Sequence, residues 1–148
     1  MVAEKEFDIQ YKNTQVGIAM LIIMGLVLAL LAFASYTKPD ESIGFVFVII
    51  GIVTLLFSSL TIQIEGTQIL WFFGPKFWTK SLELSDVLAV KKIKTKWYSG
   101  IGIRLTSTGW LYNVSGLSAV ELKLKNGTTV SLGTNDPDNL MNAIENRR

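Results

Sequence analysis

The chain contains neither cysteine nor histidine. Without cysteine it has no disulfide framework, no thiolate nucleophile and no thiolate zinc site. Without histidine it lacks the side chain that most often acts as a base near neutral pH and as a metal ligand. Any acid–base chemistry would rest on its twelve carboxylates. We therefore expect no enzyme, no cofactor and no bound metal.

Charge is also absent from two long apolar stretches. No charged residue occurs in 13–37 or in 42–64. About 20 apolar residues cross the hydrocarbon core as a helix, so each stretch is long enough to span. We expect a leader over 1–15 and a transmembrane hairpin over 16–60, with spans at 16–36 and 43–60. Uniformly apolar runs without a polar stripe argue against a buried soluble hairpin.

A cleaved signal peptide is the alternative for the first stretch, because Ala32-Phe33-Ala34 resembles a signal-peptidase site. The stretch is longer than a typical signal-peptide core, its leader is partly acidic, and a second apolar stretch follows directly. We expect an uncleaved hairpin.

Lysine positions predict how the hairpin is oriented. Lys5 and Lys12 precede it, Lys38 alone lies at its tip, and Lys76 and Lys80 follow it. Cytoplasmic loops carry an excess of lysine and arginine. We therefore expect a multi-pass protein of the inner membrane with both termini, and the domain over 61–148, in the cytoplasm. Neither span holds an ionisable residue that would mark an ion path. Small residues are expected at the contact between the helices: Gly17, Gly25, Ala29, Gly44 and Gly51.

From Leu60 onward the hydrophobic pattern alternates, and short segments are separated by turn residues. This pattern is typical of strands in a sandwich or barrel. Glycines in 97–116 have strands on both sides, so they indicate bends of a sheet rather than a phosphate-binding loop. We count seven strands and one C-terminal helix over 61–148.

Two local details can be predicted more sharply. A three-residue loop over 125–127, with Gly127 left-handed, places Val130 opposite Leu122 and keeps the apolar side chains on one face. Asp136 followed by Pro137 predicts a helix N-cap and a first helical residue.

Three segments resemble a known family: Gly102-Ile-Arg-Leu-Thr, Gly109-Trp-Leu-Tyr-Asn-Val-Ser-Gly116 and Leu132-Gly-Thr-Asn-Asp-Pro137. They are similar to bacterial membrane-anchored pleckstrin-homology-like (PH-like) proteins. The resemblance implies an α+β membrane protein, in which a two-helix transmembrane hairpin precedes a PH-like seven-stranded antiparallel barrel with a C-terminal capping helix. It implies no settled activity. Phosphoinositide-binding relatives use basic residues in the first hairpin loop, which here is Glu65-Gly66-Thr67, so that kind of recognition is not expected.

Lysines and aromatic residues make up the candidate binding surface. Side chains of this kind suit the headgroup region of an anionic leaflet. A solvated strand edge is the alternative, since edge lysines discourage aggregation. Nucleic acid is not expected, because the net charge is only +2 and the domain is tethered to a membrane. The candidates are Lys91, Lys92, Lys94, Lys96, Trp97 and Tyr98, the cluster Lys76, Trp78 and Lys80, and Arg104.

These observations predict a membrane-anchored PH-like binding or scaffolding module at the cytoplasmic membrane surface. Its expected partners are anionic lipid headgroups or a membrane protein, and homo-oligomers are left open. The alternative is an accessory or regulatory subunit of a membrane transporter or enzyme complex. Fold alone does not decide between them.

Overall fold

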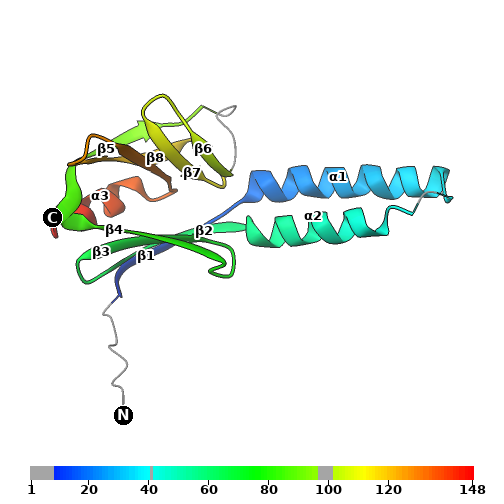
Figure 1. The fold of residues 1–148 in the computed structure, drawn as a ribbon, viewed down its shortest axis with the longest axis horizontal. Coiled ribbons are helices and arrows are strands. Elements are labelled where there is room, and N and C mark those ends of the chain that lie inside the picture. Colours follow the sequence, from blue (N-terminus) through cyan, green and yellow to red (C-terminus); the bar gives the residue numbers. More distant parts are fainter. Residues whose placement is uncertain (1–8, 41, 97–101) are drawn as a thin grey trace, which may run out of the picture.

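The computed structural model describes residues 9–40, 42–96 and 102–148 (Figure 1). Two helices project together from one end of a unit made of strands and a short helix, which we call the β domain. In chain order the elements are β1 (Ile9–Val16), α1 (Ile18–Thr37), α2 (Gly44–Leu56), β2 (Ser59–Glu65), β3 (Gln68–Phe73), β4 (Trp78–Glu83), the 3-10 helix η1 (Leu84–Asp86), β5 (Val87–Lys94), β6 (Gly102–Leu105), β7 (Gly109–Asn113), β8 (Ser118–Leu124), β9 (Thr129–Gly133) and α3 (Pro137–Glu145).

The strands form two sheets. One has the order β1-β2-β3-β4 and the other the order β5-β8-β9-β7-β6. Within the described residues no hydrogen-bonded strand pair joins the two sheets. The chain turns through η1 after β4, and β5 then pairs with β8 instead of β4. The predicted closed seven-stranded antiparallel barrel is therefore wrong: the fold is α+β with two separate sheets, the described chain has eight strands from Ser59 onward, and β7 pairs with β9 in parallel.

Strand β1 lies in the segment that we had interpreted as a leader. It pairs along its length with β2, and the register ends at the pair Val16 and Ser59. Its sequence, IQYKNTQV, is mostly polar, which hid it from a search for alternating apolar residues. The helices are thus inserted into a β-hairpin, and the β domain includes residues on both sides of them.

Helices α1 and α2 differ in length. Helix α1 has 20 residues and is apolar and long enough to cross a membrane, while α2 has 13 residues and is the shorter. At 1.5 Å per residue they measure about 30 Å and about 20 Å. The predicted hairpin of two spans is not confirmed: among the described residues only α1 is long and apolar enough to span, and the expected second span over 43–60 is shorter, because helical structure stops at Leu56 and β2 begins at Ser59. Neither helix has a buried residue within the described chain.

The core lies between the two sheets and is closed on one side by α3, which contacts β5, β8 and β1. Leu122, Leu132 and Ile144 are fully buried there, as predicted. The loop prediction is confirmed as well: Leu122 is paired with Val130, and Gly127 has a φ of +86°.

The start of α3 matches its prediction in position, although the Asp136 side chain makes no capping hydrogen bond to the helix backbone. Asp136 is the N-cap residue and Pro137 is the first helical residue. The Asp136 carboxylate accepts hydrogen bonds from the Tyr11 hydroxyl, at 3.2 Å, and from the Asn139 amide, at 2.9 Å. This cap therefore connects α3 to β1.

Candidate functional site

Both helices join the β domain at one end, which we call the helix-proximal end (residues 17, 58, 74–78, 94–96 and 114–118). Here the amide of Gly17 donates to the carbonyl of Ser58 at 2.7 Å, and the amide of Gly74 donates to Ser59 at 3.0 Å. A Cβ at Gly74 would lie 2.7 Å from the backbone oxygens of Leu55 and Leu56, so only glycine permits this approach. The β3–β4 turn therefore sits directly against the end of α2.

The β7–β8 turn reaches the same end. A Cβ at Gly116 would lie 2.9 Å from the Gln15 side-chain amide, near the end of β1. The amide of Thr95 donates to the carbonyl of Leu117 at 2.8 Å, which brings the end of β5 to the same place. The end of β5, which carries Lys94 and Lys96, therefore lies beside the β7–β8 turn.

An aromatic cluster surrounds the predicted Lys76, Trp78 and Lys80 group. The Phe57 ring lies 5.3 Å from that of Phe73 and 6.4 Å from that of Phe77, which in turn lies 6.3 Å from Trp78. The Lys76 ammonium lies 5.1 Å from the centre of the Phe72 ring, and the Lys80 ammonium 5.6 Å from that of Trp78. Cations over aromatic faces are held by the ring quadrupole. Sequence reasoning missed Phe57, which looked like part of a span.

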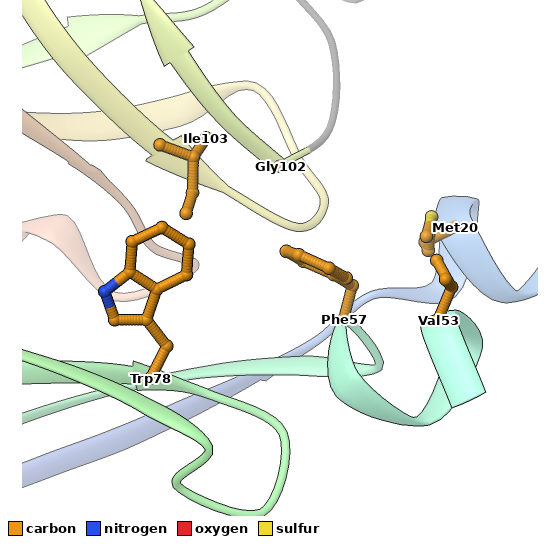
Figure 2. A pocket seen from close by; sticks show the side chains of 6 residues that line it. All are labelled: Met20, Val53, Phe57, Trp78, Gly102 and Ile103. Carbon is orange, nitrogen blue, oxygen red and sulfur yellow. The ribbon is translucent and has the colours of Figure 1, made fainter.

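An apolar pocket opens between these aromatics and β6 (Figure 2). Its volume is about 390 Å³. Trp78 begins β4 and Ile103 belongs to β6, and these two strands are the edges of different sheets. In Figure 2 their side chains point toward one another, while Phe57 closes the side next to the helices. We call this the seam pocket, lined by Met20, Val53, Phe57, Trp78, Gly102 and Ile103.

The remaining candidate residues do not form one surface. Lys92 lies toward α3, where its ammonium is 3.3 Å from the carboxylate of Asp138. Lys91 is paired in register with Glu121. Arg104 is exposed on edge strand β6, and Trp97 and Tyr98 lie outside the described residues.

Lys94 and Lys96 line a second, more polar pocket of about 340 Å³ together with four hydroxyl side chains: Thr95, Thr106, Thr108 and Ser131. The Thr106 hydroxyl already donates to the carbonyl of Gly109 at 2.8 Å, so it serves the β6–β7 turn. The two lysines are the part of the predicted β5 group that stays at the helix-proximal end.

The titratable groups of the described residues indicate structural roles. Burial raises the pKa of Tyr11 to about 12, and the neighbouring Asp136 carboxylate raises it as well. Burial also raises the pKa of Tyr112. Within residues 9–40, 42–96 and 102–148, no three carboxylate side chains gather as a metal site would require. The buried indole N–H of Trp71 meets no acceptor in the same part of the chain.

The helix glycines do not lie where we expected them. A Cβ at Gly25, Gly44 or Gly51 would meet nothing within 4 Å, so these glycines do not line the contact between α1 and α2. Gly17 lies at the base of α1, where an added Cβ would lie 3.3 Å from the Cβ of Val114.

Comparison with known proteins found no matching family model, no matching curated protein and no matching solved structure. The resemblance to PH-like proteins stays a prediction.

Proposed function

We propose that the protein is a membrane-anchored, non-catalytic binding module, with its helices in the inner membrane and its β domain against the cytoplasmic surface. The observation that carries this proposal is the set of side chains at the helix-proximal end of the β domain. The β3–β4 turn, which carries Lys76, Phe77 and Trp78, packs against the end of α2, and the end of β5, which carries Lys94 and Lys96, is hydrogen-bonded through Thr95 to the β7–β8 turn.

Acidic residues of the first sheet lie at the opposite end of their strands. Glu65 ends β2, Glu83 ends β4, and Asp86 follows in η1. An anionic leaflet at the helix-proximal end would meet lysines and aromatic rings rather than these carboxylates. Each lysine near such a surface contributes about 1 kcal/mol of attraction, and aromatic rings favour the headgroup level.

Pairing of β1 with β2 constrains the topology of any insertion. The chain leaves the β domain at Gly17 and returns at Ser58, two residues whose backbones are hydrogen-bonded. A single crossing by α1 would put β1 and β2 on opposite sides, which their pairing forbids. In the proposed arrangement both helices enter the bilayer from the same side, and the connecting residues complete the return of the shorter α2.

The PH-like assignment is part of this proposal. It is supported by the order of the elements, since strands in two sheets, antiparallel except for the pair β7 and β9, are followed by one C-terminal helix that packs on the core. The ligand class that we propose is an anionic lipid headgroup.

A second candidate is an accessory or regulatory subunit of a membrane transporter or enzyme complex. The observation in its favour is the open space at Gly25, Gly44 and Gly51. Small residues allow close approach of another transmembrane helix. Co-purification of a stoichiometric membrane protein in mild detergent would favour this candidate.

The test uses the full chain in lipid nanodiscs, with hydrogen exchange as the measurement. We expect α1 to be protected in any lipid, and residues 74–78 and 94–96 to gain protection in anionic over zwitterionic discs. Replacing Lys94 and Lys96 by Gln should remove that gain, while the control pair Lys123→Gln and Lys125→Gln should keep it. The choice spares Lys92 and its ion pair with Asp138. Failure of the chain to sediment with membranes would refute the proposal.

A further inference from the structure

The walls of the seam pocket are apolar on every side that the described residues supply. Met20 and Val53 come from the helices, Phe57 from the end of α2, and Trp78 and Ile103 from two edge strands. A volume of about 390 Å³ falls within the range of small-molecule sites. Such a lining favours an apolar ligand, because water would find few hydrogen-bond partners there.

The pocket is continuous with the surface of the helices. Met20 lies in the first turn of α1, and Val53 lies in the last turn of α2. Figure 2 shows both side chains to the right of Phe57, on the side from which the helices leave the β domain. A chain lying along the outside of the helices would thus reach the pocket without crossing a polar layer.

A cation stands beside this apolar pocket. Trp78 and Lys80 are paired in register with Phe73 and Trp71, which are buried in the core, so they share the core-facing side of β4. The Lys80 ammonium lies 5.6 Å from the centre of the Trp78 ring. Among the described residues no carboxylate forms an ion pair with Lys80. An anionic group on the ligand would supply that counter-charge.

We propose that the seam pocket binds an anionic membrane lipid, with part of an acyl chain between Trp78 and Ile103 and the phosphate near Lys80. The inference rests on the proposed function, because it takes the helices to lie in the bilayer. The proposed function describes a general contact with the membrane surface, and this inference adds a specific site. One lipid leaves the leaflet in part and enters the seam pocket between the edge strands β4 and β6.

The experiment uses the full chain in nanodiscs that contain phosphatidylglycerol with a photoactivatable group on its acyl chain. After irradiation, adducts are mapped by peptide mass spectrometry. We expect adducts on the β4 and β6 peptides that carry Trp78 and Ile103, in addition to adducts on α1 and α2.

Filling the pocket should remove the adducts on the β4 and β6 peptides and leave the adducts on α1 and α2. Ile103→Trp should lower labelling of the Trp78 peptide at least about fivefold, because the indole occupies the cavity. Leu105→Trp is the matched control, since Leu105 lies on the same face of β6 but is 66% exposed and outside the pocket. Met20→Trp fills the same cavity from the helix side, so a folding defect in one variant leaves the other to decide.

The headgroup contact has its own control. The ratio of labelling by phosphatidylglycerol to labelling by phosphatidylcholine at Trp78 should fall about fivefold in Lys80→Gln, the factor that corresponds to about 1 kcal/mol. Lys125→Gln makes the same charge change in the β8–β9 turn and should leave the ratio unchanged.

The outcomes separate this inference from the proposed function. Adducts confined to α1 and α2 would overturn the lipid site and leave the membrane anchor intact. An absence of adducts on the whole chain would overturn both.

Discussion

At the scale of single residues, backbone space at glycines decides whether strands can pair. Gly109 begins β7, has a φ of +149°, and is paired with Thr129 of the parallel strand β9. A Cβ at Gly109 would lie 1.9 Å from the backbone oxygen of Thr129. Because the obstacle is backbone, no change of rotamer can relieve the clash.

Gly109→Ala should therefore destabilise the β domain by more than about 2 kcal/mol, since overpacking and backbone strain act together. Gly127→Ala is the control: its φ is +86° but its surroundings are open, so strain alone should cost about 1 kcal/mol. Denaturant unfolding of the full chain in detergent measures both. Equal losses in the two variants would contradict the packing of β7 on β9.

Core packing gives a second prediction at this scale. Leu122 is fully buried between the sheets and α3, so Leu122→Ala should cost about 2–5 kcal/mol. Leu88→Ala, at a half-exposed position on β5, should stay within about 0.5 kcal/mol of the parent. Thermal melts compare the two, and a loss below about 1 kcal/mol at Leu122 would mean that the inward face is assigned wrongly.

The Tyr11 hydroxyl provides a pH-dependent prediction. Its pKa is raised to about 12 in the folded state from about 10 in the unfolded chain. The folded state thus holds this proton more tightly, so the associated stability is complete below pH 10 and is lost as the pH rises toward 12. Tyr11→Phe should flatten the fall in stability between pH 10 and 12, as followed by denaturant titrations. Tyr112 is retained in the variant. If stability falls between pH 10 and 12 as steeply as in the parent, Tyr112 rather than Tyr11 causes the fall.

At the scale of elements, the insertion of α1 and α2 between paired strands makes β1 an integral part of the β domain. The pair Val16 and Ser59 closes the register of β1 with β2. Two paired antiparallel strands can be joined by a two-residue turn, for which Asn-Gly is preferred.

Replacing residues 17–58 by Asn-Gly should give a soluble, folded β domain. A fragment of residues 61–148 should fail to fold cooperatively, because it lacks β1 and the buried Leu60. Circular dichroism melts and the dispersion of amide NMR signals distinguish the two. A fragment that melts like the Asn-Gly variant would show that β1 contributes nothing.

At the scale of the whole molecule, the prediction concerns which side of the membrane each end occupies. The chain has no cysteine, so single cysteines can be introduced without background. In intact cells an impermeant maleimide should label Lys38→Cys at the hairpin tip and should reach Lys125→Cys only after lysis. The reverse pattern would overturn the orientation, and equal labelling before lysis would argue against insertion.

Features that depend on neighbours along the chain could be read from the sequence. The strand segments, the loop at Gly127, the register of Leu122 with Val130 and the cap of α3 at Asp136 all follow from alternation, turn chemistry and capping. Each involves a few successive residues, whose side chains reveal which face is buried and where the chain turns.

Features that depend on distant partners were decided only by the tertiary structure. Polar β1 is a strand because β2 offers it a free edge, and the sheets stay separate because β5 pairs with β8 rather than β4. The predicted lysine surface divides because α3 brings Asp138 to Lys92. The seam pocket likewise needs two sheet edges and two helix ends at one place. Backbone hydrogen bonding between strands is nearly independent of side chains, so a local pattern shows that a strand exists but leaves its neighbour undetermined.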